Sequence, residues 1–176
     1  MNICKKFTFS VSQDVIDKCD NKDIIEQINI LNMYIFEDTK INHISRLKKQ
    51  YELLEFSETK NTHLSSAYIL NLISQTNIQI GSLSTALDSS MKAKSKWKSV
   101  VKQKHGLSGL VLCYSDIGQI YMKMGLIDES LEYFDKGLSL LDNSDELFVP
   151  FFKIHYHLAE VYYDLNFFSK SYEMIN

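Results

Sequence analysis

The strongest constraint on the fold is a stretch near the middle of the chain that recurs on both sides of itself. In YSDIGQIYMKMGLIDESLEYFDKGLSLL, residues 114–141, two short amphipathic segments of helical character meet at Gly125. The same kinds of residue reappear 44 positions earlier, from Ile73, and 41 positions later, from Leu158. Self-similarity at a spacing of this size is typical of stacked supersecondary units. The chain is therefore expected to consist of copies of one helical hairpin.

Small residues mark where the two helices of each hairpin should cross. The first helices carry them at Ser74, Gly118 and Ala159, and the second helices carry them at Ala86, Ser130 and Ser171. Two antiparallel helices approach closely where small side chains face each other. The turns between the helices are expected at Gly81, Gly125 and Asn166. Glycine and asparagine are the residues that most readily adopt the left-handed conformation that ends a helix.

This pattern resembles the tetratricopeptide repeat. In the copy over residues 111–142 the resemblance rests on Ile117, Gly118, Tyr121, Gly125, Phe134 and Gly137. That copy departs from the family at Ser130 and Gly137, where alanine is usual, and it lacks the closing proline. The copy from Ala67 departs further, with Asn77 in place of tyrosine and Ser90 in place of phenylalanine. Because the spacing exceeds the usual 34 residues, the chain is similar to the longer-helix variants of bacterial signalling proteins and kinesin light chains.

The resemblance implies an all-α fold, a right-handed superhelical solenoid of antiparallel helix pairs. Residues 1–20 are expected to form an N-terminal tail or a short helix, and residues 21–60 a divergent helical hairpin. Residues 61–176 hold the repeats, divided at about 61–105, 106–147 and 148–176. One proline and six glycines in 176 residues suit long helices with short connections.

Several classes of protein are disfavoured by composition. No apolar run approaches the roughly 18 residues of a membrane helix, and the N-terminus lacks the features of a signal peptide, so a cytoplasmic location is expected. The three cysteines lack CxxC spacing, which indicates neither a disulfide framework nor a zinc site. Cys113 lies on an apolar helix face and is expected to be a small core residue. A net charge of −3 gives no general attraction to nucleic acid or anionic membrane.

The two ends of the chain carry their own expectations. Asp20 or Asn21 can cap a helix over residues 24–36. A second helix, over residues 41–56, shows an apolar face at Ile41, Ile44, Leu47, Tyr51 and Leu54. The last copy should begin its first helix at Pro150 and its second near Phe168. Solenoids end in a polar capping helix, and none follows here, which favours a fragment of a longer protein.

The resemblance places the first helices of the hairpins along a concave groove. It implies the groove residues Tyr68, Asn71, Gln75 and Ile78, then Leu112, Ser115, Gln119 and Met122, and finally Lys153, Tyr156, Glu160 and Tyr163. Amides and tyrosines suit an extended peptide or a partner helix; a solvated face without a ligand is the alternative. The carboxylate clamp of chaperone adaptors needs Lys, Asn and Arg at set positions. Only Lys153 fits that pattern, so a ligand with a C-terminal carboxylate is not expected.

Two other clusters of polar residues are expected to have structural rather than functional roles. In residues 91–106, Lys94, Lys98 and Lys102 form one stripe, which is expected to be a solvated face near a helix C-terminus. Trp97 within this run is expected to pack between repeats. His157 and Glu160 lie one turn apart, while His155 points elsewhere, and zinc needs three or four convergent ligands. No cofactor is indicated, and with no phosphate-binding loop or nucleophile motif the chain is not expected to be an enzyme.

The leading hypothesis is a non-catalytic scaffold that binds a peptide or protein segment in its groove. It would serve as the N-terminal regulatory module of a larger bacterial signalling protein, and a diguanylate cyclase is one output domain that follows such repeats. One alternative is self-association as a homodimer through the end near Phe167 and Phe168. The other alternative is an intracellular peptide-pheromone receptor. The partner is expected to be protein or peptide rather than nucleic acid.

Overall fold

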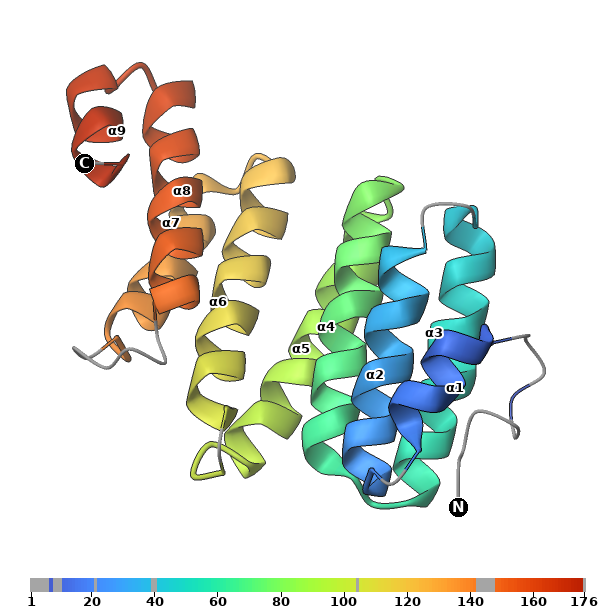
Figure 1. Ribbon diagram of the computed structural model, residues 1–176. Helices are drawn as coiled ribbons and strands as arrows, with labels where there is room; N and C mark the ends of the chain where they lie inside the picture. The colour runs from blue at the N-terminus through green and yellow to red at the C-terminus, as the bar shows by residue number, and fades with distance from the viewer. Residues whose placement is uncertain are drawn as a thin grey trace.

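The computed structural model describes residue 7 and residues 11–20, 22–38, 41–103, 105–141 and 148–175. These residues form nine α-helices and no strand, so the all-α prediction is confirmed for them. The helices are α1 (Gln13–Cys19), α2 (Ile24–Glu37), α3 (His43–Thr59), α4 (His63–Gln79), α5 (Leu83–Ser99), α6 (Gly106–Lys123), α7 (Ile127–Leu138), α8 (Phe148–Asp164) and α9 (Phe168–Ile175). Figure 1 shows α1–α5 in one arm of the molecule and α6–α9 in the other.

One turn geometry recurs at four helix junctions. The predicted turn residues Gly81, Gly125 and Asn166 have φ angles of 78°, 77° and 61°, which are left-handed. The N–H of the residue after each turn residue donates to a carbonyl five positions earlier, as from Ser82 to Asn77 at 2.9 Å. This is the Schellman termination, which satisfies carbonyls that a helix end would otherwise leave without partners. Asn61, with φ of 52°, makes the same turn between α3 and α4; its resemblance to Gly81 was not anticipated.

The predicted helix crossings are tied by small side chains. Ser74 on α4 and Ala86 on α5 are both buried, and the Ser74 hydroxyl donates to the Ala86 carbonyl at 2.9 Å. In the last pair the roles reverse, because the Ser171 hydroxyl of α9 donates to the Ala159 carbonyl of α8 at 2.9 Å. A larger residue at these points would push the helices apart. The repeat pattern therefore predicted the crossing points correctly.

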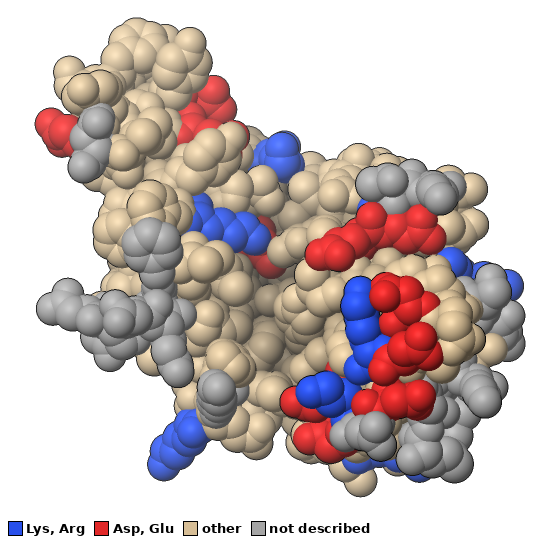
Figure 2. All heavy atoms as spheres, viewed as in Figure 1, with Lys and Arg blue, Asp and Glu red and all other residues tan. Residues whose placement is uncertain are grey.

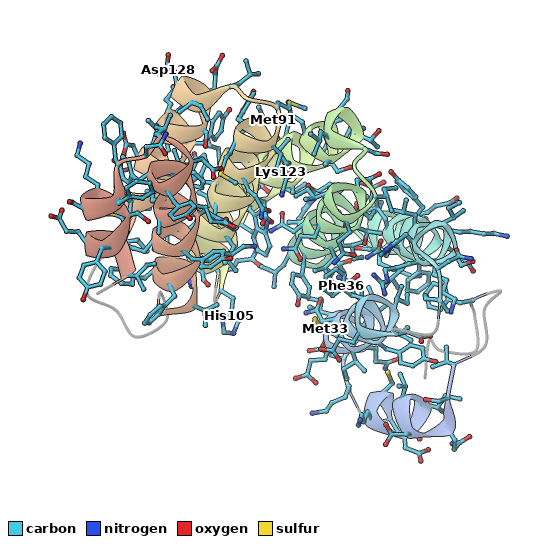
Figure 3. The ribbon with its side chains drawn as sticks, turned by 90° about the horizontal axis from the view of Figure 1, so that it is seen from above. Met33, Phe36, Met91, His105, Lys123 and Asp128 are labelled. Atoms are coloured by element: carbon cyan, nitrogen blue, oxygen red, sulfur yellow. The ribbon has the colours of Figure 1, made fainter. Side chains whose placement is uncertain are left out.

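Successive hairpins share a face. The helices α2, α4, α6 and α8 each contact the next member of that series, and α3, α5 and α7 each pack on the first helix of the following pair. Figure 3, viewed from above, shows α2, α4, α6 and α8 along the inner side of an arc. Met33 of α2 and His105 at the start of α6 lie on the hollow side of that arc. The first helices of the hairpins thus line one continuous surface.

The hydrophobic core is divided in the same way. One buried cluster joins α1–α4 around Leu31, a second joins α4–α6 around Trp97, and a third joins α6–α8 around Phe134. Each cluster therefore lies between neighbouring hairpins, and the described residues do not share one common hydrophobic core. Within the described residues, no helix is both long and apolar enough to cross a membrane.

Three local predictions are wrong. The N-cap of α2 is Asp23, whose side chain accepts from the Glu26 N–H at 2.8 Å, so Asp20 is not the cap; Asn21 lies outside the described residues. The buried face predicted for α3 is wrong in part, because Ile44 is 78% and Tyr51 46% exposed, although Leu47 and Leu54 pack against the core. Helix α8 begins at Phe148, two residues before the expected Pro150.

The buried face of α3 is polar, and this explains the error. It consists of Arg46, Gln50, Leu53 and Ser57. Arg46 donates to the Asp38 carbonyl at 3.0 Å, and the Thr76 hydroxyl of α4 donates to Gln50 at 3.2 Å. Buried polar groups are tolerated where they find hydrogen-bond partners. Apolar periodicity alone therefore could not locate the polar residues on the buried face of this helix.

Candidate functional site

A pocket opens on the inner side of the arc between α2, α4 and α6. Its volume is about 290 Å³, and it receives four of the predicted groove residues, Tyr68, Asn71, Gln75 and Leu112. The remaining wall includes Asn29 of α2, Trp97 of α5, and His105, Ser108 and Gly109 around the start of α6. We call this cavity the anchor pocket. None of the described residues that line it is Asp, Glu, Lys or Arg.

A second hollow adjoins the first and extends toward α8. It has a volume of about 270 Å³ and is lined by Gln75, Ile78, Gln79, Gln119, Lys153 and His157. We call it the amide pocket. Gln75 borders both cavities, so together they form a groove that crosses α2, α4, α6 and α8. Figure 2 shows the molecule hollowed between its two arms, with charged side chains gathered mainly over the N-terminal helices.

Asp116 ties the floor of the groove together. Its carboxylate is buried, with a side chain only 1% exposed, and it accepts a hydrogen bond from Lys153 of α8 at 2.5 Å. The Gln75 amide of α4 lies 3.3 Å from the other carboxylate oxygen. A buried carboxylate requires such partners because its desolvation costs several kcal/mol. The network therefore links three helices and neutralises Lys153, the one Lys or Arg among the described residues that line the two pockets.

The ion pair between Lys153 and Asp116 also argues against a carboxylate clamp. Lys153 was the only residue at a clamp position with the required charge. Since Lys153 already neutralises Asp116 at 2.5 Å, its charge is not available to a carboxylate ligand without the loss of that pair. Asp116, which is not among the predicted groove residues, links α4, α6 and α8 at the floor of the groove.

The predicted groove residues divide into two sets. Tyr68, Leu112 and Lys153 are half-buried at equivalent positions, as are Gln75, Gln119 and Glu160. The first three, with Gln75 and Gln119, line the inner surface, whereas Glu160 lines the hollow between α8 and α9. Asn71 and Ser115 are buried, at 4% and 0% exposure. Asn71 still borders the anchor pocket, and its side-chain oxygen accepts a hydrogen bond from Trp97 of the same hairpin. Ser115 is covered completely, and its hydroxyl has no hydrogen-bond partner.

The remaining predicted residues gather at the end formed by α8 and α9. Met122, Tyr156, Glu160 and Tyr163 share a shallow hollow of about 450 Å³ with residues of α9. Tyr156, which is equivalent to the buried Asn71 and Ser115, is 58% exposed, and Tyr163 is 63% exposed. These two tyrosines therefore belong to an end surface more than to the groove between α2 and α8.

His157 and Glu160 form an internal pair. The His157 Nδ1 atom lies 2.8 Å from a Glu160 carboxylate oxygen, and the ring stacks on Phe134. Burial lowers the pKa of His157 against the opposing effect of Glu160, so the ring is neutral at pH 7. The charge of Glu160 and a hydrogen bond to it raise the pKa of Tyr156. His155 instead stacks on Phe151 of its own helix, so the two histidines do not converge.

The lysine-rich segment and its tryptophan behave largely as expected. Lys92 pairs with Asp88 at 2.7 Å and Lys96 with Glu58 at 3.1 Å, while the Lys94 ammonium lies over the Tyr133 ring. Trp97 is 4% exposed and packs in the core cluster between α4, α5 and α6, which confirms its packing role. Its ring also forms a wall of the anchor pocket, a second role that its sequence position did not reveal.

Cys113 is a core residue, as predicted. It is fully buried, and its thiol donates to the Ser90 carbonyl at 3.3 Å. Burial raises the pKa of the thiol, which therefore stays protonated. In the part of the chain that the structure describes, no three His, Cys, Asp or Glu side chains are placed to hold a metal ion.

Sequence reasoning missed Asn29, Asp116, His105 and Gly109 at this site. Asn29 lies in the hairpin without the repeat signature, and His105 lies in a connection, so periodicity gives no signal for either. Gly109 is required because a Cβ atom there would lie 2.4 Å from the Trp97 ring. No known protein-family model and no curated protein matches this chain.

Proposed function

We propose that the chain is a non-catalytic scaffold of the tetratricopeptide type that binds an extended peptide or protein segment along the groove from α2 to α8. The observation that carries the proposal is the pair of adjoining pockets on the inner side of the arc, joined at Gln75. Stacked helical hairpins present such concave surfaces to extended ligands. A right-handed superhelix within a larger bacterial signalling protein remains the context we favour for this groove.

The chemistry of the groove suits a peptide backbone. Gln75, Gln79 and Gln119 line the amide pocket, and amide side chains both donate to carbonyls and accept from N–H groups. The nearest acid–base pair, His157 with Glu160, is satisfied internally, and His157 is only 4% exposed. These features support binding rather than catalysis.

Peptides selected from a displayed random library provide the test. We expect Gln119→Ala to weaken a selected peptide about tenfold, a loss of about 1.4 kcal/mol, in a fluorescence anisotropy titration. The matched control is Ile44→Ala, because Ile44 is 78% exposed on α3. Equal affinities for the two variants, with unchanged circular dichroism, would contradict binding in the groove.

A second candidate function is self-association through the α8–α9 end. This surface carries exposed aromatic residues, including Tyr163, Phe167 and Phe168, each more than half exposed. Contiguous apolar surface of this kind marks interaction sites in soluble proteins, and a second copy of the chain offers a matching apolar surface. A mass that rises with concentration in light scattering, and that Phe168→Asp abolishes, would support it. A constant monomer mass would exclude it.

A further inference from the structure

The anchor pocket has a defined shape because its wall is held from behind. The Trp97 ring lies against Gly109 so closely that a Cβ atom at position 109 would come within 2.4 Å of it. The ring is also fixed by its Nε1–H, which donates to the side-chain amide oxygen of Asn71 at 3.3 Å. A wall fixed on two sides costs little ordering entropy when a ligand binds. The pocket is therefore preorganised rather than formed by the ligand.

Two hydrogen bonds determine which polar atoms the pocket offers. The indole N–H of Trp97 can only donate, so the Asn71 atom that meets it must be the oxygen. The Asp116 carboxylate can only accept, so Gln75 must present its nitrogen to Asp116. The opposite ends of the two amides remain for a ligand: the nitrogen of Asn71 as donor and the oxygen of Gln75 as acceptor. These residues are one helical turn apart on α4, which suits the C=O and N–H of a peptide backbone.

The wall determines what kind of side chain can enter. Its apolar lining includes Tyr68, Leu72, Trp97 and Leu112, and among the described lining residues there is no Asp, Glu, Lys or Arg. Lys153, which lines the neighbouring amide pocket, is paired with Asp116. A charged ligand side chain would lose its hydration here without meeting an oppositely charged Asp, Glu, Lys or Arg among the described lining residues, at a cost of several kcal/mol. The pocket therefore discriminates against acidic and basic side chains alike.

Size sets a further limit. The volume of about 290 Å³ falls at the small end of the range of roughly 300–1,000 Å³ for pockets that enclose a drug-sized ligand. A single large side chain is a better match than a whole cofactor. Affinity at peptide interfaces is concentrated in such buried apolar anchors.

From these four observations we infer that the anchor pocket binds one uncharged, large apolar side chain of the peptide, aromatic or aliphatic, while Asn71 and Gln75 hold its backbone. The inference rests on the proposed peptide-binding function and adds the specificity of its central position. An acidic side chain is disfavoured at this position by desolvation rather than by repulsion, since none of the described residues that line the pocket is Asp or Glu.

Capped amino acids test this directly. The probes are N-acetyl-phenylalaninamide and N-acetyl-leucinamide, compared with the corresponding glutamate and lysine amides. Trp97 is the only tryptophan in the chain, so its indole N–H gives a single resonance at the pocket wall in a ¹⁵N correlation spectrum. We expect the two apolar amides to shift this resonance saturably and the two charged amides to bind at least about tenfold more weakly.

Two variants locate the binding. Ser108→Leu adds an apolar side chain to the pocket wall, and Leu64→Glu places a charge on that wall. Each is expected to weaken the phenylalanine amide about tenfold, with folding checked by circular dichroism. Gln119→Leu on the same helix α6 is the matched control, because Gln119 lines only the amide pocket of the two, and its effect should stay within about twofold.

The outcomes separate this inference from the proposed function. If none of the four amides shifts the Trp97 resonance, or all shift it equally, the anchor inference is wrong, while selected peptides can still bind through α6 and α8. A different outcome is that the apolar amides bind, but longer peptides with the same side chains bind no more tightly and their affinity is unchanged by Gln119→Ala. The pocket then binds a small apolar molecule. In that case both the peptide side chain and the peptide-binding function are overturned.

Discussion

In two of the hairpins, residues sixteen positions apart on the two helices contact each other, and the contact differs between the two. In the middle pair, Gly118 leaves room for Phe134, whose ring would lie 2.6 Å from a Cβ atom at position 118. In the preceding pair, the equivalent residues Ser74 and Ser90 are both buried and share a hydrogen bond of 2.6 Å. The apparent departure of Ser90 from the repeat pattern is therefore compensated by Ser74. The two positions form a matched pair in both of these copies.

This pairing predicts a rescue. Ser90→Phe alone should lower the free energy of unfolding by about 2 kcal/mol, because the ring overpacks against Ser74. Adding Ser74→Gly recreates the arrangement of Gly118 with Phe134 and should restore at least about 1 kcal/mol. Urea unfolding of the two single variants and the double variant measures the coupling. Strictly additive losses would mean that the two residues do not compensate each other.

A second residue-scale prediction concerns His157 and acid. Its pKa in the folded protein is lowered from the ordinary 6.5, chiefly by burial. As pH falls below about 6.5 the unfolded chain takes up a proton that the folded chain resists, so stability decreases toward the lower folded pKa. The contribution cannot exceed about 1.4 kcal/mol per pH unit.

The test compares His157→Gln with His155→Gln between pH 7 and pH 5. We expect His157→Gln to flatten the loss of stability in urea unfolding, whereas His155→Gln should retain it, since His155 is more exposed on the same helix. Identical pH profiles for the wild type and His157→Gln would show that burial of this ring does not govern the acid response.

At the scale of helices, the repeat pattern predicted the crossings and turns of α4–α9 but not the polar contacts between hairpins. The turns at Gly81, Gly125 and Asn166 could be predicted because the left-handed conformation that ends a helix favours glycine or asparagine. The buried face of α3 could not be predicted in this way, because Arg46 and Gln50 are compatible with burial only through hydrogen-bond partners on other segments. The same holds for Asp116, whose role depends on Gln75 and Lys153 from two other helices.

The link between α6 and α8 gives a prediction at this scale. Lys153→Met leaves the buried Asp116 carboxylate without its cation and should lower the free energy of unfolding by about 3 kcal/mol. The double variant Asp116→Asn with Lys153→Met removes both charges and should recover most of that loss. Lys98→Met, an exposed site on α5, serves as the control. Similar stabilities of the Lys153 and Lys98 variants in urea would show that the pair does not join the helices.

The whole molecule presents two surfaces of different character. The groove between α2 and α8 combines uncharged walls with amides fixed by internal hydrogen bonds. The α8–α9 end is apolar and open, and Phe168 and Ile175 are exposed there. The sequence pattern placed residues of both surfaces in one groove. Tyr156 and Tyr163 occupy groove positions in the repeat but lie at the α8–α9 end in the structure. Only the stacking of the hairpins separates the two.

Site-specific photo-crosslinking tests the central claim most directly. A photoreactive phenylalanine analogue is placed at Gln119 in the groove or at Phe168 at the α8–α9 end, and each protein is irradiated with a labelled peptide selected against the wild type. The account predicts a crosslinked adduct at position 119, competed by excess unlabelled peptide, and none at position 168. Crosslinking at 168 and not at 119 would contradict peptide binding in the groove.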